Sequence, residues 1–163
     1  MNEIRNKNSY ETLVYDFTKE VYVICPNCNK KAIVKSEKFY DENVKLVCTN
    51  CGFNKTPEKE SIRHSNMKNS NNLIKNVVVI GGGIDPYFYL PLWLSTNVGE
   101  NLFWAYNYEH LNFIKGFVSA KLRERNIEES MSNKSLGSRL PKWITSHKNR
   151  DIILKTIEKL EKK

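Results

Sequence analysis

Two pairs of cysteines are the residues in this sequence whose type and spacing are best suited to chemistry. Each pair has the spacing C-x-x-C, and nineteen residues separate the pair Cys25 and Cys28 from the pair Cys48 and Cys51. A tight C-x-x-C turn brings two thiolates to the same side of an ion, and zinc prefers four such ligands in a tetrahedron. The spacing therefore predicts one structural Zn²⁺ ion bound by all four cysteines, with no open position for catalysis.

Other uses of four cysteines are less consistent with this sequence. Two disulfides would suit a secreted chain, but the first twenty residues lack the apolar segment of a signal peptide. A thioredoxin-like redox pair would follow a βαβ pattern, and no such pattern precedes Cys25. An iron site of the rubredoxin type uses the same four ligands, so the choice between zinc and iron stays open. The three histidines, His64, His110 and His147, are not needed as ligands and are expected to be ordinary surface or partly buried side chains.

The first half of the chain divides by composition into three stretches. Residues 1–18 are a polar lead-in, and residues 19–56 hold the cysteines among short β-branched runs that predict strands. A segment of about forty residues buries too little apolar surface to fold alone, so the metal is expected to stabilise it. Residues 57–76 are polar and rich in Asn and Ser, which predicts a linker or long loop.

Residues 77–163 are predicted to form an α+β region. The run VVVI at 77–80 is typical of a buried strand, and two apolar runs predict a β-hairpin over 90–107. Apolar residues then recur at helical spacing, which predicts a helix over 108–125 and C-terminal helices over 140–161, with Pro141 in a first helical turn. The expected fold class is α+β: an N-terminal zinc ribbon, a small antiparallel sheet and C-terminal helices.

Two family resemblances accompany these patterns. Residues 20–56 resemble the zinc ribbons of transcription factors, polymerase subunits and many bacterial proteins, which implies the fold of this segment and binding of nucleic acid or protein, or fold stabilisation alone. Five motifs lie between residues 85 and 144: DPYF at 85–88, LPLWL at 90–94, LFWAYN at 102–107, LRER at 122–125 and SRLPKWI at 138–144. They resemble those of a group of bacterial zinc-ribbon proteins of uncharacterised function, so the resemblance implies no activity.

The charge of the chain suggests a class of partner. The formal net charge is +8, and residues 134–163 contain nine Lys or Arg against three Asp or Glu. A basic end of this kind attracts phosphate groups or an acidic protein surface. No run is long and apolar enough to span a membrane, and cysteines kept as a metal site fit a reducing compartment, so we expect a cytoplasmic protein. The candidate nucleic-acid contacts are Arg139, Lys142, Lys148 and Arg150.

Three functional hypotheses follow from the sequence. The first is a non-enzymatic binding protein that contacts nucleic acid through its basic end. The second is a protein–protein interaction module, such as an adaptor or an immunity protein that blocks a toxin. The third is an enzyme that uses Asp85, Glu109 and His110, which only proximity in the sequence supports, so an enzyme is not favoured. No feature of the sequence specifies an oligomeric state.

Three consecutive glycines after VVVI also invite a nucleotide-binding interpretation. In the dinucleotide-binding pattern G-x-G-x-x-G counted from Gly81, the third glycine position is occupied by Pro86. Proline also restricts Asp85 away from helical geometry, so no helix begins there. The glycines are therefore predicted to form a turn and not a phosphate-binding loop.

Overall fold

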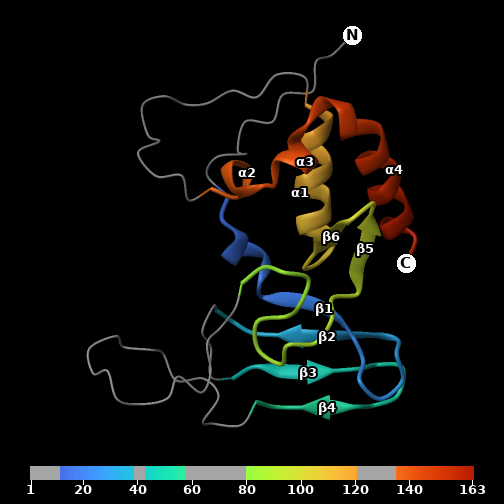
Figure 1. Ribbon diagram of the computed structural model, residues 1–163. Coiled ribbons are helices and arrows are strands. Elements are labelled where there is room, and N and C mark those ends of the chain that lie inside the picture. Colours follow the sequence, from blue (N-terminus) through green and yellow to red (C-terminus); the bar gives the residue numbers. More distant parts are fainter. Residues whose placement is uncertain (1–11, 39–42, 58–79, 121–134) are drawn as a thin grey trace, which may run out of the picture.

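The computed structural model describes residues 12–38, 43–57, 80–120 and 135–163, and it has α+β architecture (Figure 1). A four-stranded antiparallel sheet lies at one end of the molecule, and the helices gather at the other end around a two-stranded hairpin. The predicted fold class is confirmed, with the cysteines in turns that connect strands of the N-terminal sheet. Within the described residues, no helix has the length and apolar character needed to cross a membrane.

The N-terminal sheet carries the cysteine turns and has strand order β1-β2-β3-β4. Its inner face is made by the alternate residues of each strand, such as Val23 opposite Ala32 and Val34 opposite Leu46, and these side chains are buried. The period-2 pattern of β-branched residues in the sequence explains this arrangement. The four strands are β1 (Glu20–Ile24), β2 (Lys31–Lys35), β3 (Lys45–Val47) and β4 (Asn54–Lys55).

Part of the polar lead-in is ordered and belongs to the core. A short 3-10 helix, η1 (Val14–Phe17), precedes β1 and buries the side chains of Val14 and Phe17. The carboxylate of Asp16 accepts a hydrogen bond from the backbone N–H of Leu13 at 2.8 Å, which satisfies a free donor at the start of this turn. Residues 1–11 lie outside the described part of the chain.

The hairpin consists of β5 (Leu94–Val98) and β6 (Asn101–Ala105), and its strands are shorter than the predicted range of 90–107. Its two-residue turn begins at Gly99, whose φ of +59° is the left-handed value that the first central position of a type II′ turn requires. Most of the predicted strand at 77–80 lies outside the described residues, and Ile80 itself is not in a strand.

Residues just before the hairpin run along β1 instead of forming part of the hairpin. The backbone N–H of Ile24 donates to the carbonyl of Pro91 at 2.9 Å, and that of Trp93 donates to the carbonyl of Tyr22, also at 2.9 Å. The backbone N–H of Tyr22 donates to the carbonyl of Tyr106 at 2.8 Å. The edge of β1 is therefore hydrogen-bonded to the later part of the chain, and the two sheets are joined.

The helices are shorter than the periodicity predicts. The helix expected over 108–125 is α1 (Tyr108–Ser119); Ala120 has extended backbone (φ −64°, ψ 126°), and residues 121–125 lie outside the described part. The C-terminal region begins with three short turns before its one long helix, α4 (Arg150–Glu161), which packs beside α1 (Figure 1). Those turns are α2 (Leu136–Arg139), α3 (Lys142–Thr145), which Pro141 precedes as N-cap, and η3 (His147–Asn149).

Among the described residues, two hydrophobic clusters form the interior. One cluster fills the space under the N-terminal sheet and includes Cys25 and Cys48 together with Tyr87, Leu92 and Tyr106 from the later part of the chain. The other lies between the hairpin, α1 and α4. The predicted linker falls almost entirely in residues 58–79, outside the described part, so the predicted division into 19–56 and 77–163 stays a prediction.

Candidate metal centre

The first cysteine turn follows directly from β1. Its first member, Cys25, donates its backbone N–H to the carbonyl of Lys30 at 2.8 Å, and its own carbonyl accepts from the N–H of Asn29 at 2.9 Å. Asn29 has a φ of +57°, in the left-handed region that asparagine tolerates better than most residues. These bonds close a tight turn in which Cys25 and Cys28 face the same side.

The second cysteine turn repeats this geometry between β3 and β4. Cys48 donates its backbone N–H to the carbonyl of Phe53 at 2.8 Å, and its carbonyl accepts from the N–H of Gly52 at 2.9 Å. Gly52 has a φ of +73°, so it occupies the position that Asn29 has in the first turn. The two turns therefore present their cysteines in equivalent ways from opposite sides of the site.

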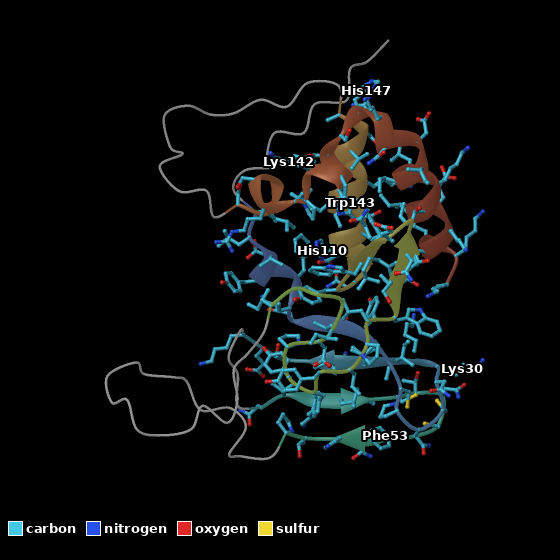
Figure 2. All side chains as sticks on the ribbon, in the orientation of Figure 1. Lys30, Phe53, His110, Lys142, Trp143 and His147 are labelled. Carbon is cyan, nitrogen blue, oxygen red and sulfur yellow. The ribbon has the colours of Figure 1, made fainter. Side chains whose placement is uncertain are left out.

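The four sulfur atoms form a compact group at one end of the N-terminal sheet, beside Lys30 and Phe53 (Figure 2). All four Sγ atoms lie within 4.8 Å of one another, with Cys25 and Cys51 3.7 Å apart and Cys28 and Cys48 3.6 Å apart. A tetrahedral ion with metal–sulfur bonds of about 2.3 Å requires sulfur separations of about 3.8 Å. The cysteines thus have the geometry for one metal ion, and they are not paired as disulfides.

The four thiols differ in burial and in hydrogen bonding. Cys25 and Cys48 are buried, Cys28 is half-buried and Cys51 is exposed. Burial raises the pKa of the Cys48 thiol to about 11, because the charged form loses solvation. A hydrogen bond from the Asn27 amide lowers the pKa of Cys51 to about 6. A bound cation deprotonates coordinating thiols outright, so it is expected to hold all four as thiolates.

Two asparagines at this site were not among the residues that we predicted. The amide nitrogen of Asn27 lies 3.5 Å from the Sγ of Cys51, and that of Asn50 lies 3.6 Å from the Sγ of Cys28. The signal in the sequence is that both turns have asparagine at their third position, in C-P-N-C and C-T-N-C.

The predicted nucleic-acid contacts lie along the segment from α2 to α4. Arg139, Lys142 and Lys148 are exposed, whereas Arg150 is half-buried and its guanidinium donates to the carbonyl of Ala120 at 3.2 Å. Lys142 lies at the helical end of the molecule, far from the sulfur atoms (Figure 2). The basic side chain of Lys142 and the cysteine cluster therefore lie at opposite ends of the described part of the chain.

The three residues of the enzyme hypothesis, Asp85, Glu109 and His110, differ in burial. The carboxylate of Asp85 is buried and accepts backbone N–H groups from three residues of its own loop, at distances of 2.6 to 2.9 Å; they are Tyr87, Phe88 and Leu90. Burial raises the pKa of this carboxyl, although the three hydrogen bonds oppose the shift. Glu109 is exposed at the start of α1.

His110 is buried in a group of aromatic rings. Its Nδ1 atom accepts the backbone N–H of Tyr106 at 3.2 Å, and burial lowers its pKa to about 3, so the ring is neutral. His147 is exposed, and His64 lies outside the described residues. The glycines 81–83 all have positive φ values, and the N–H of Gly81 donates to the phenol oxygen of Tyr106 at 3.0 Å, which is the turn that the sequence predicts.

Comparison of the chain with protein-family models, with curated proteins and with solved structures finds no match. The function proposed below therefore depends on the geometry of the site and on the surface of the molecule.

Proposed function

We propose that the chain is a zinc-binding protein in which a single Zn²⁺ ion is bound by Cys25, Cys28, Cys48 and Cys51 and has a structural role. The observation that carries this proposal is the separation of the four sulfurs, which fits a tetrahedral ion with about 2.3 Å bonds. All four ligands come from the protein, so the ion stabilises the fold and offers no open position to a substrate.

The surroundings of the sulfurs support a role in folding. The ion would tie the turn after β1 to the turn after β3, and the two innermost ligands, Cys25 and Cys48, belong to the hydrophobic cluster under the sheet. Zinc binding to a small module of this kind contributes directly to its folding free energy. The test is metal analysis of purified protein by native mass spectrometry, with one zinc per chain expected. A reddish protein with one iron would support the rubredoxin-type alternative instead.

The partner function that we propose is binding of nucleic acid through the basic segment at the helical end. Arg139, Lys142 and Lys148 are exposed there, and the whole chain has a net charge of +8. Such contacts release counterions from the nucleic acid, so affinity is expected to fall steeply with salt. Since this segment lies far from the sulfurs, zinc is expected to support binding only through the fold (Figure 2).

A charge-matched pair of variants tests this function. Replacing Arg139, Lys142 and Lys148 by alanine should weaken binding to short DNA and RNA and make the slope of log K against log salt shallower by about two to three. The control replaces three exposed lysines on or beside the N-terminal sheet, Lys19, Lys45 and Lys55, and removes the same charge. Equal weakening in both variants would indicate nonspecific attraction. Absence of binding at low salt would favour the protein-interaction alternative, which a nuclease-resistant pull-down tests.

A further inference from the structure

The two asparagines beside the cysteines form a reciprocal pair across the site. Each asparagine directly precedes the second cysteine of its own turn, and each donates its amide to the second cysteine of the other turn: Asn27 to Cys51 and Asn50 to Cys28. The separations of 3.5 and 3.6 Å are within the range of hydrogen bonds to sulfur. The two contacts therefore follow the same near-symmetry as the turns.

The sulfurs that receive these bonds are the two that solvent can reach. Cys28 is half-buried and Cys51 is exposed, whereas Cys25 and Cys48 are buried in the core. An ion with four thiolates carries excess negative charge, which amide donors offset without adding a charge of their own. Protonation or displacement of a ligand begins at sulfurs that water and competing chelators can approach, so donors are most useful at Cys28 and Cys51.

We infer that Asn27 and Asn50 are paired positioning residues for the metal, each holding a solvent-facing thiolate of the opposite turn in place and slowing loss of the ion. The inference rests on the proposed zinc site and deepens it. Both donors cross between the turns, so they connect the two halves of the site independently of the ion. Residues that hydrogen-bond to metal ligands contribute roughly a factor of 10 to 100 to metal affinity in other proteins.

Substitution by aspartate separates this role from a role in turn structure. Asn27→Asp and Asn50→Asp keep the shape of the side chain and an oxygen of the kind that can accept hydrogen bonds in a tight turn, but they replace the amide donor by a carboxylate that repels thiolate. Asn27→Ala and Asn50→Ala remove the side chain without adding charge. If the asparagines act on the thiolates, zinc loss is fastest with aspartate; if they act on the turns, aspartate retains zinc better than alanine.

The control is Asn54→Asp. Asn54 is exposed, lies three residues after Cys51 and donates its amide to the carbonyl of Gly52 at 3.3 Å, so the variant places the same new charge near the site without removing a donor to sulfur.

Two measurements on the full chain provide the readouts. The first is the rate of zinc transfer to excess chromophoric chelator, where we expect Asn54→Asp to resemble the wild type and each aspartate variant at 27 or 50 to be about 10 to 100 times faster. The second is the absorption spectrum of the Co²⁺-loaded protein. In the variants at positions 27 and 50, the thiolate-to-metal charge-transfer band should shift in wavelength. Its intensity should stay at the level expected for four thiolate ligands.

Each outcome has a definite meaning. Transfer rates equal to that of Asn54→Asp, or slower loss with aspartate than with alanine, would overturn the inference while leaving the zinc site intact. A wild-type protein that takes up no metal would overturn the proposed zinc site, and the inference with it.

Discussion

The imidazole of His110 lies almost parallel to the ring of Phe17, with their centroids 4.9 Å apart and their planes at 14°. Trp104 meets the same imidazole edge-on at 5.5 Å, and Tyr106 lies 5.7 Å away. The histidine thus connects η1, β6 and the first turn of α1 in one aromatic group. Its Nδ1 atom can accept the N–H of Tyr106 only while it is unprotonated, so this packing requires a neutral ring.

The burial of His110 predicts loss of stability in mild acid. Its pKa is about 3 in the folded protein, below the value of about 6.5 expected when unfolded, so the unfolded chain binds more protons between these pH values. The stability contributed by the neutral ring is complete above about pH 6.5 and is lost as pH falls toward 3. At pH 5 the expected loss is about 2 kcal/mol relative to pH 7, measurable by urea unfolding.

The variant His110→Phe provides the comparison. It keeps the ring stack but cannot be protonated, so its stability should be lower at pH 7, since the N–H of Tyr106 loses its acceptor, and should vary less between pH 7 and 5. Acid also weakens metal binding by thiolates, a contribution that both proteins share and that cancels in the difference between their pH profiles. Parallel profiles for the two proteins would contradict the prediction.

Asp85 predicts a second effect on stability. Its carboxylate accepts the three backbone N–H groups of Tyr87, Phe88 and Leu90. Asp85→Ala leaves these donors without their acceptor and is expected to cost about 2 to 4 kcal/mol in unfolding free energy. Asp85→Asn keeps one oxygen and should cost less. Near-equal stability of wild type and Asp85→Ala would contradict this role.

Local patterns in the sequence predicted the parts of the fold that local chemistry determines. The C-x-x-C spacing identified Cys25 and Cys51 as members of one cluster, and two apolar runs identified the hairpin, whose turn the structure places at Gly99 with a positive φ. The alternation of β-branched residues likewise identified the strands around the cysteines.

The remaining features depend on contacts between residues far apart in the sequence. The Asn107 amide donates to the carbonyls of Phe17 and Glu20, and its oxygen caps α1 by accepting the N–H of His110. Residues Pro91 and Trp93 leave the predicted hairpin because they find hydrogen-bond partners on β1. No periodicity encodes such pairings. The end of α1 was also missed, since Ala120 is a strong helix former and only its context makes it extended.

The glycine turn predicts a graded effect of added methyl groups. Gly82 and Gly83 have φ values of +82° and +77°, and a Cβ atom at Gly82 would meet nothing, whereas one at Gly83 would lie 2.5 Å from Cδ2 of Leu102. Gly82→Ala should therefore lower the unfolding free energy only by the strain of a left-handed alanine, about 1 to 2 kcal/mol. Gly83→Ala should lower the unfolding free energy further, since Leu102 must also move.

The double variant Gly83→Ala/Leu102→Ala isolates the contribution of the contact between the added methyl group and Leu102. Leu102 is 44% exposed, so its truncation alone is expected to have a small effect, and in the Gly83→Ala background it should restore part of the stability. Thermal unfolding of the four proteins measures the coupling. Additive losses would show that Leu102 does not limit this turn.

The position of the tryptophans allows zinc removal to test how far the metal stabilises the molecule. All three tryptophans, Trp93, Trp104 and Trp143, lie outside the cysteine segment, so their fluorescence reports on the later part of the chain and on its contacts with the N-terminal sheet. The cluster that contains Cys25 and Cys48 also contains Tyr87, Leu92 and Tyr106, and Trp104 packs against it. Chelation should therefore lower the unfolding temperature detected by tryptophan fluorescence, although no tryptophan is near the ion in sequence. Added zinc should restore the unfolding temperature, and Cys51→Ser should reproduce the chelated state.

The contrary outcome is complete loss of zinc by mass spectrometry while the tryptophan-detected transition stays at its original temperature. In that case the metal stabilises only the N-terminal sheet, and the shared cluster does not couple the two parts.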